Sequence, residues 1–575
     1  MEPVMTSVDN QPKAKELPEF VHFQGTSPRT SSAKTPSEIF QLFFTTAILS
    51  CIVEQTKLFA SQKGKTLELC NQELMAFIGI NIAMGMLRLP QVKDYWSTNK
   101  ILATPWFPGI MARDRFYTIL RYIHLADSAL QKQKGESGYD PLFKVRFLID
   151  HLSAVYPQYY YPSRYLSIDE MMVGTRCRIS FLQYLPKKPT KFGIKVWVNA
   201  EAKTGYVLNF QVYTGSDTKT KEKGLSHRVV MDLMRPYFFK KHCLFVDNFY
   251  TSVELLGDLL DKGTYCVGTA RSNRKHFPID IIPDNSTSIG TFRFAVGTRC
   301  EAATTTMEAN ESAVVSSTVC PVTAPLELVS DPLAAESREA TAEVSANQDG
   351  SQGNNVQGQG KCDDKIVALW WRDRRDVLAL TTMHNTSASM VMKRPKGSRD
   401  KQPLPCPTAI IDYNQYMGGV DLMDQHLSYY SMTARRTLKW WKKVFWRLVD
   451  ISVVNSWIIF HCNNPESDVK THREFRMKLV DQLVQPLLDL RASTDCPRYL
   501  CDSKGRPAKG SDVHLLGKHF AYKGMKRGRC SVCYSDVSPA TNKKKDKKTQ
   551  NYCKKCEVYL CAGACFEIYH TRSTF

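Results

Sequence analysis

The chain has 575 residues, of which 77 are Lys or Arg and 56 are Asp or Glu, so its formal net charge is +21. This length predicts about two to four structural units, and the charge indicates a polyanion, by default nucleic acid, as the partner. The longest apolar run, residues 74–87, contains Asn81 and is shorter than the roughly 20 residues of a membrane span. The N-terminus lacks the apolar region of a signal peptide. We therefore expect an intracellular protein without a membrane partner.

The N-terminal region of the chain is predicted to contain a leader and a helical zone. Residues 1–35 are rich in Pro, Ser, Thr and Lys, offer little to bury, and are expected to be disordered. From residue 36 to about 164, apolar residues recur at helical spacing. Breaks at LRLPQVKDYW and ATPWFPG separate the predicted helices. This zone is therefore mostly α.

Between about residues 165 and 298 the pattern changes to strands. A short helix is predicted over 251–263, because Thr251 and Glu254 have capping-box spacing and Lys-Gly ends the segment. Together with the helical zone, these elements predict an α/β multidomain fold. The predicted strands cover 164–169, two runs within 194–215 joined by a Lys-Thr-Gly turn, 242–247 and 264–271.

Residues 301–360 differ in composition from the rest of the chain. They contain no aromatic residue, no Lys, a single Arg at Arg338, and nine Asp or Glu. Such a segment buries little and is predicted to be a solvated insertion. It separates two strand-like stretches, 290–296 and 365–384, that would otherwise pair as neighbours. We interpret it as a loop grown out of a hairpin, although a retained non-coding stretch would have the same composition.

Aspartates stand at the ends of these predicted elements. Asp169 is placed at or near the end of the first strand, and Asp247 ends the strand over 242–247. Asp421 and Asp424 follow a glycine pair at a predicted helix start, and their spacing puts both on one face. Aspartates suit Mg²⁺, and two such ions about 4 Å apart can cleave a phosphodiester. A lone aspartate in such a position is more often structural, so the predicted two-Mg²⁺ site depends on the set.

Four stretches of the chain resemble a known family. In their order they are similar to the piggyBac transposases and their host-derived relatives, over roughly residues 36–500 and the C-terminal cysteines. The resemblance implies an RNase H-like catalytic core that cuts and joins DNA at a Mg²⁺ site. Its three metal-binding aspartates would be Asp169, Asp247 and Asp421, with Asp424 beside them. The stretches are SIDEMMVGTRCRISFLQYLPKKPTKFGIKVWV (167–198), FVDNFYTS (245–252), GTARSNRKHFP (268–278) and YNQYMGGVDLMDQH (413–426).

The resemblance also implies an order of domains. The helical DNA-binding and dimerisation domain would be split around the catalytic core, and an insertion domain would lie between the second and third aspartates. Because of 301–360 this interval is longer than is usual in the family, which leaves the shape of the insertion domain open. The predicted units are the leader 1–35, a first helical segment (36–164), a first catalytic segment (165–270), the insertion domain (271–410), a second catalytic segment (411–430), a second helical segment (431–500), a basic linker (501–527) and a cysteine-rich domain (528–575).

A lysine-rich segment between the first two aspartates is expected to line a DNA channel. Two prolines hold this segment extended, so that its ammonium groups can meet phosphates. A solvated protein surface would have a similar composition. The lysines are Lys187, Lys188, Lys191 and Lys195.

A second basic cluster precedes two tryptophans at the start of a long helix predicted over 435–460. Aromatic rings beside cations can stack on exposed bases, whereas a tryptophan buried in the helix core is the alternative for one of the two. The resemblance singles out Trp440, which matches a family tryptophan near the transposon-end hairpin. The cluster consists of Arg435, Arg436, Lys439, Trp440 and Trp441.

Cysteines crowd into the C-terminal region of the chain, which holds eight of the 18 after residue 490. In a reducing compartment this indicates metal rather than disulfides, and pairs separated by two or three residues are typical of zinc sites. A unit with so few apolar residues is not expected to fold without metal. Seven ligands fill one tetrahedral site and most of a second, with His519 as the candidate for the eighth. The seven are Cys530, Cys533, Cys553, Cys556, Cys561, Cys565 and His570.

The family carries a comparable cross-braced domain with two Zn²⁺ ions that binds transposon ends or partner proteins. The sequence therefore predicts a nuclear, Mg²⁺-dependent DNA transposase of the piggyBac type, or a host gene descended from one. Its expected partners are double-stranded DNA, namely transposon terminal repeats and TTAA target sites, a second copy of the chain as a homodimer, and chromatin proteins. The alternative is a non-catalytic DNA- or chromatin-binding protein that kept the fold and the zinc module.

Overall fold

The computed structural model describes residues 17–298 and 365–571, except for 187, 216–223, 284–286, 395–399, 435–436, 494–520, 536–545 and 555. The chain divides into two units, and all described residues except Thr298 and Lys365 belong to one of them. The acidic segment 301–360 lies outside the described residues. So do most of the predicted linker 501–527 and four residues with predicted roles: Lys187, Arg435, Arg436 and His519.

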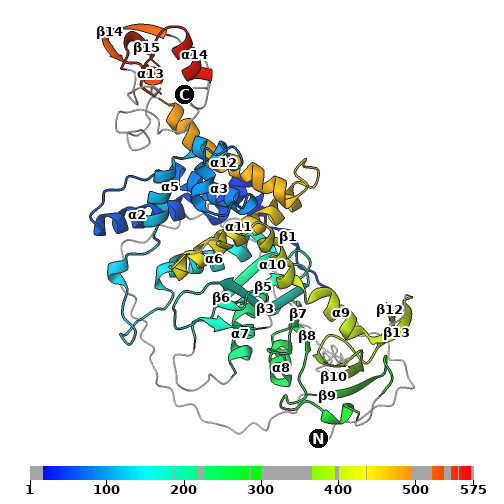
Figure 1. The fold of residues 1–575 in the computed structure, drawn as a ribbon. Coiled ribbons are helices and arrows are strands. Elements are labelled where there is room, and N and C mark those ends of the chain that lie inside the picture. The colour runs from blue at the N-terminus through cyan, green and yellow to red at the C-terminus, as the bar shows by residue number, and fades with distance from the viewer. Residues whose placement is uncertain are drawn as a thin grey trace, which may run out of the picture. The chain divides into compact units, whose positions relative to one another are not determined.

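The first predicted catalytic segment, 165–270, contributes six strands to a nine-stranded sheet, whereas the second, 411–430, is helical (Figure 1). Its central portion has the order β6-β5-β3-β7-β8, in which β6, β5 and β3 are antiparallel and β7 and β8 run parallel to β3. Beyond β8 the sheet continues with β11, β10 and β9, while β4 pairs with β5. The strands are β3 (Tyr165–Gly174), β4 (Gln183–Tyr184), β5 (Phe192–Glu201), β6 (Val207–Val212), β7 (Cys243–Val246), β8 (Tyr265–Thr269), β9 (Phe292–Thr298), β10 (Lys365–Arg372) and β11 (Asp376–Thr381).

Both faces of this sheet are covered, and the strand sequences reflect it. On β7, Leu244 and Val246 belong to the main core, whereas Cys243 and Phe245 belong to a second cluster with α9 (Thr408–Tyr416). A strand buried on both faces becomes a continuous apolar run, as in the CLFV of β7. Further helices on the sheet include α7 (Leu225–Met234), which contacts β5 and β6, α8 (Val253–Asp261), which contacts β8, and α10 (Gly419–Tyr429), which contacts β3 and β5.

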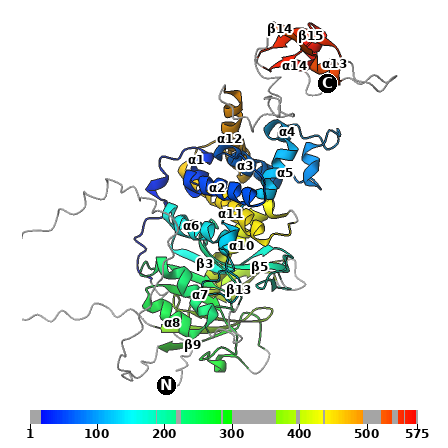
Figure 2. The ribbon, with the colours of Figure 1, turned by 90° about the vertical axis from the view of Figure 1, so that its left-hand side faces the viewer.

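Helices from two distant regions of the chain pack together beside the sheet (Figures 1 and 2). α3 lies against α12, α1 lies against α11 and α12, and α11 also contacts α6 and β3. The helices are α1 (Pro36–Phe43), α2 (Thr46–Gln62), α3 (Asn71–Met86), α4 (Trp106–Ile110), α5 (Arg113–Tyr122), α6 (Phe143–Tyr159), α11 (Trp440–Asn463) and α12 (His472–Ala492).

Helix α11 is apolar on nearly all sides because other elements surround it. Among the described helices, it is the one long and apolar enough to cross a membrane, and the bent pair of α1 and α2, which meet at 65°, would be a second if counted as one span. However, 83% of the apolar window of α11 is buried inside the protein, as is usual for a core helix.

The predicted strands of the central sheet are confirmed, with adjusted ends. The stretches 290–296 and 365–384 lie side by side in the sheet as β9 and β10, with β11 following, so the strands of the predicted insertion domain extend the same sheet. The helix predicted over 251–263 starts later, because Ser252 rather than Thr251 is its cap, with Ser252 Oγ accepting from the Leu255 amide. The remaining strands of 271–410 form the pair β12 (Ala388–Lys393) and β13 (Gln402–Pro407).

A stretch of the predicted disordered leader is ordered, which corrects that prediction for residues 17–35. β1 (Gly25–Thr26) pairs with β2 (Tyr160–Tyr161), and the buried Thr30 hydroxyl donates to the Ser27 carbonyl and accepts from Asn463. Small polar side chains are buried here because each one has a hydrogen-bond partner.

Candidate metal centres and nucleic-acid interface

Two of the predicted aspartates come from adjacent parallel strands. Asp169 is the fifth residue of β3, and Asp247 directly follows β7. Ile168 is aligned with Val246 in this pair, so both aspartates stand where the parallel pairing ends. The sequence predicts Asp169 at or near the end of its strand; this is wrong, because β3 stays paired with β5 as far as Gly174. Asp169 is therefore held in the middle of a strand.

A glycine brings α10, with Asp421 and Asp424, close to the same strands. A Cβ atom on Gly419 would lie 2.5 Å from Ser167 Oγ, which is shorter than any real contact, whereas a Cβ on Gly418 would meet nothing within 4 Å. The second glycine of the pair is thus required for close approach of the helix start to β3. This packing places the two helical aspartates beside the sheet.

The ammonium group of Lys188 lies among these carboxylates. Its Nζ is 3.6 Å from Asp169 Oδ2 and donates a hydrogen bond of 3.3 Å to the Glu170 carbonyl oxygen. Burial lowers the pKa of this lysine, but the nearby carboxylates raise it more, so the pKa lies above its ordinary value. Lys188 also acts on the carboxyl of Asp247. The carboxylates that raise its pKa are those of Asp169, Glu170, Asp421 and Asp424.

Burial makes the charged forms of these carboxyl groups costly. It raises the pKa of Asp169 to about 7, and the carboxylates of Glu170 and Asp247 act in the same direction. Burial likewise raises the pKa of Asp424 to about 6 and that of Asp247 above its ordinary value. A bound cation would stabilise the charged forms that the protein alone disfavours.

The donor chemistry of this cluster fits Mg²⁺, because carboxylate oxygens are the hard ligands that this ion prefers. Within the described residues, no three carboxylates bring their oxygens within 4.8 Å of one another. Two ions about 4 Å apart would each take only some of the set, so a single point of convergence is not needed. Asp169, Asp247 and Asp421 are the residues that would hold them.

Sequence reasoning missed three side chains beside this cluster. Alternation along β3 puts Glu170 on the face opposite Asp169, yet its carboxylate contributes to the pKa shifts of both Asp169 and Asp247. Tyr250 is buried, and its hydroxyl has no hydrogen-bond partner among the residues that the structure describes. Tyr413 on α9 has its pKa raised to about 12 by burial and by three of the aspartates. Glu170 and Tyr250 are close to predicted aspartates in the sequence, whereas Tyr413 comes near Asp169 and Asp247 only through long-range packing.

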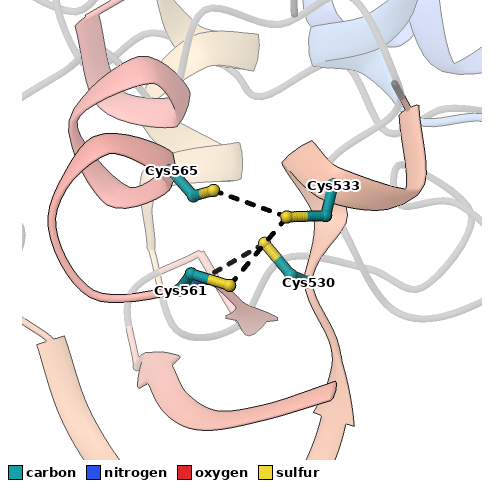
Figure 3. A group of neighbouring side chains, drawn as sticks. All are labelled: Cys530, Cys533, Cys561 and Cys565. Atoms are coloured by element: carbon teal, nitrogen blue, oxygen red, sulfur yellow. Dashed lines mark hydrogen bonds between the residues drawn. The ribbon is translucent and has the colours of Figure 1, made fainter. Parts of the chain in front are cut away.

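The C-terminal segment brings four cysteines into one set (Figure 3). Cys533 Sγ lies 3.6 Å from Cys565 Sγ and 3.9 Å from Cys561 Sγ, and the Cys561 amide donates to Cys530 Sγ. Four sulfurs at about 2.3 Å from one zinc ion would be about 3.8 Å apart, so this set could bind zinc. The elements of the segment are β14 (Ala521–Arg529), α13 (Ser531–Ser535), β15 (Lys548–Cys553), β16 (Val558–Tyr559) and α14 (Ala564–Thr571).

A second set consists of Cys553, Cys556 and His570. His570 Nε2 lies 3.5 Å from Cys556 Sγ, and Nδ1 lies 2.7 Å from the Phe566 carbonyl oxygen. Donation from Nδ1 to that carbonyl leaves Nε2 as the lone-pair nitrogen, which is the state that a metal ion requires. The two sets interleave along the chain, since the first and third cysteine pairs form one of them. His519, predicted as the eighth ligand, lies outside the described residues.

Comparisons with known proteins show the family of the chain. A family model described as Transposase IS4 matches residues 35–323 and 333–457. The chain belongs to the piggyBac transposase family. Human PiggyBac transposable element-derived protein 3 is 26% identical over 546 residues, or 94% of this chain and 76% of that protein. Human PiggyBac transposable element-derived protein 2 is 22% identical over 534 residues, or 90% of this chain and 76% of that protein.

A solved structure shares the fold. The cryo-EM structure of a piggyBac transposase synaptic complex with hairpin DNA has a TM-score of 0.64 with this chain at 21% identity, covering 94% of this chain and 98% of that one. The chain thus has an α/β multidomain fold resembling that of a piggyBac transposase.

Within this family fold, the lysines predicted to line a DNA channel have different surroundings. Lys191 is exposed, whereas Lys188 contacts Asp169. Lys195 is buried on β5, 3.6 Å from the carboxylate of Glu170 and with its ammonium over the ring of Phe249. Lys195 therefore neutralises a carboxylate inside the protein, whereas it was expected from the sequence to line a DNA channel.

The second predicted basic cluster is described only from Thr437 onward. Lys439 is exposed, with its ammonium 5.3 Å from the ring centre of Phe59. Trp441 is buried, while Trp440 is half-buried and meets Phe181 edge-on at 5.3 Å. One of the two tryptophans is thus a core residue, the alternative considered from the sequence, and Trp440 keeps some of its ring accessible.

Proposed function

We propose that the chain is a piggyBac-type DNA transposase that cleaves and joins DNA by cut-and-paste. Asp169, Asp247 and Asp421 would hold two Mg²⁺ ions, with Asp424 beside them. The observation that carries the proposal is the gathering of these carboxylates around one ammonium group, that of Lys188, where the parallel pairing of β3 and β7 ends.

The topology of the sheet supports an RNase H-like core. In the order β6-β5-β3-β7-β8, the central strand has an antiparallel neighbour on one side and a parallel neighbour on the other. This arrangement brings one aspartate from each parallel strand to the same place, and α10 adds a third from a distant region of the chain.

Each side chain has a distinct role in this mechanism. Bound Mg²⁺ would activate the attacking oxygen and stabilise the leaving oxygen of the phosphodiester. Asp169 and Asp247 orient oxygens from a rigid sheet, so their positions are fixed before substrate arrives. Lys188 neutralises the carboxylates in the free protein, and the exposed Lys191 on the same segment binds a DNA phosphate.

The proposal extends to partners, zinc and compartment. The substrates are double-stranded transposon ends and TTAA target sites, the active form is a homodimer, and the protein works in the nucleus. The net charge of +21 supports a DNA partner, as does the hairpin DNA in the similar synaptic complex. The two cysteine sets would hold two structural Zn²⁺ ions in a domain that binds transposon ends or chromatin proteins.

A non-catalytic DNA- or chromatin-binding protein derived from a transposase is the second candidate. It is favoured by the names of the human relatives, which are transposable element-derived proteins. The two candidates differ in whether the aspartates bind metal and cleave DNA.

The test combines metal binding with excision. Asp169→Asn, Asp247→Asn and Asp421→Asn should each weaken Mn²⁺ binding, measured by electron paramagnetic resonance, and reduce excision of a matched transposon from a plasmid by roughly a thousandfold. DNA binding should persist. The control is Asp468→Asn, whose side chain is 88% exposed. Wild-type excision by Asp421→Asn would contradict the catalytic proposal, and DNA binding without any metal-dependent cleavage by the native chain would favour the non-catalytic candidate.

A further inference from the structure

Two hollows with a cationic lining adjoin one another beside the start of α11. One, of about 810 Å³, is lined by the exposed Arg88, Arg121 and Lys439 and by the buried Lys442, and the other, of about 830 Å³, by the exposed Arg176 and Lys191. Leu438 and Lys443 line both, and no carboxylate lines either. A continuous concave surface whose exposed charged side chains are all cationic fits a polyanion.

Leu438 stands at the junction of the two hollows. Its side chain is 97% exposed, the highest value for a large apolar side chain among the described residues. An exposed apolar side chain in the middle of a cationic surface does not attract phosphates, so the exposure of Leu438 indicates a contact with some other part of the partner.

The backbone on both sides of Leu438 is anchored. The Thr437 carbonyl accepts a hydrogen bond from the Cys177 thiol (3.3 Å), and Thr437 Oγ1 accepts one from the Lys439 amide (3.2 Å). Two residues after Leu438, Trp440 packs against the core and begins α11. The leucine side chain is therefore exposed on an anchored backbone, so less conformational entropy is lost when it contacts a partner.

We propose that Leu438 is a wedge that enters between the bases of DNA bound along the two hollows and keeps unpaired bases apart. Apolar side chains that enter a base step unstack it, and the surrounding lysines and arginines would hold the phosphates on both sides. The inference rests on the DNA binding in the proposed function, and it adds that this surface prefers unpaired to paired DNA.

The experiment compares two DNA probes of equal length and charge, a blunt duplex and the same duplex with a central unpaired bubble that carries 2-aminopurine. The full-length native chain should bind the bubble roughly tenfold more tightly than the duplex and increase 2-aminopurine fluorescence. Leu438→Ala should lose both effects and keep its duplex affinity and its salt dependence, because no phosphate contact is removed. Leu438→Lys should bind both probes more tightly yet also lack the preference.

The matched control is Ile101→Ala, which removes another highly exposed aliphatic side chain, 90% accessible, that lines neither hollow. It should behave as the native chain. If Leu438→Ala keeps the preference for the bubble, or if the native chain binds both probes equally, the wedge is refuted while DNA binding stands. If the native chain binds neither probe, the proposed function fails as well.

Discussion

The two candidate metal centres of this chain are built in opposite ways. The cysteine sets take their ligands from one short segment, Cys530 to His570, in whose small buried cluster three of the six residues are candidate ligands themselves. The aspartates come from β3, the end of β7 and α10, and a core that runs through the sheet and the helices around it holds these elements in place.

This difference decides what each site needs from its metal. Where ligands form the core, metal binding and folding are one process. Where a large apolar core positions the ligands, the fold stands without metal, and removal of the ions leaves the scaffold in place. We therefore expect metal to control the stability of one region and only the chemistry of the other.

Chelation gives the largest expected effect. Removing zinc from the full-length chain should abolish amide-exchange protection in β14 and β15 and leave protection in β3 and β7 unchanged. Native mass spectrometry should find two zinc ions per chain before treatment. Cys530→Ser should reproduce the loss locally, whereas Cys462→Ser, at an exposed cysteine far along the chain from both sets, should not. Protection in β14 and β15 that survives chelation would show that the segment folds on its apolar residues alone.

The scaffold that holds the aspartates should be sensitive to its own buried charges. Asp450 on α11 and Arg476 on α12 form an ion pair of 3.7 Å with both side chains fully buried. Asp450→Ala leaves a buried guanidinium without its counter-charge and should lower the unfolding free energy of this region by about 3–5 kcal/mol, measured by urea denaturation. Exchange protection in β14 and β15 should not change. Asp468→Ala breaks an ion pair of equal length at the surface and should cost less than about 0.5 kcal/mol.

A smaller change tests how α10 is held against the sheet. Gly419→Ala places a Cβ atom 2.5 Å from Ser167 Oγ, so α10 must shift, and overpacking of this kind costs about 1–3 kcal/mol. Because Asp421 and Asp424 move with the helix, Mn²⁺ affinity should fall together with stability. Gly418→Ala is the matched control, since nothing lies within 4 Å of its new Cβ atom. Equal Mn²⁺ affinities of the two variants would show that this contact does not position the aspartates.

The region that comprises the nine-stranded sheet and the helices around it should also lose stability in mild acid. Burial lowers the pKa of His242 from 6.5 to about 4. Between these pH values the unfolded chain binds a proton at this imidazole and the folded chain does not, so stability falls as the pH falls. From pH 7 to pH 5 this histidine should cost about 1–2 kcal/mol. His242→Gln should reduce the loss by that amount, whereas the exposed His461, replaced in the same way, should not. An unchanged pH dependence in His242→Gln would contradict the assignment.

Much of the sheet could be predicted from the sequence because its strands are short, apolar and bounded by turns, as in the CLFV of β7. The cysteine ligands were also accessible, because their spacing is local. The sequence could not show which cysteine pairs share a site, because Cys530 and Cys561 meet only through the fold of β14–β16. The roles of the aspartates remain predictions that the family resemblance and the topology support.

The features that the sequence did not reveal depend on distant contacts. Simple alternation puts Glu170 on the face opposite Asp169 and gives no sign that its carboxylate acts on the pKa of Asp169 and Asp247. Lys195 was expected to face solvent, although Glu170 and Phe249 contact its ammonium group. The order in residues 25–30 depends on hydrogen bonds to partners such as Asn463, which no local pattern encodes. Side chains of these kinds gain their environment only when the whole chain has folded.

The smallest effect is expected for the acidic segment 301–360, which by its composition adds to neither kind of scaffold. It has no aromatic residue to bury, and the strands before and after it, β9 and β10, are already neighbours in the sheet. Replacing 301–360 by a short Gly-Ser turn should therefore raise the unfolding free energy by about 1–2 kcal/mol at most, because closing a shorter loop costs less entropy. Metal binding at both centres should be unchanged. The control replaces the segment by a Gly-Ser chain of equal length, and its unfolding free energy should equal that of the native chain. A clear fall in thermal stability in both variants would mean that the segment packs against the sheet, and the interpretation of 301–360 as a solvated loop would be wrong.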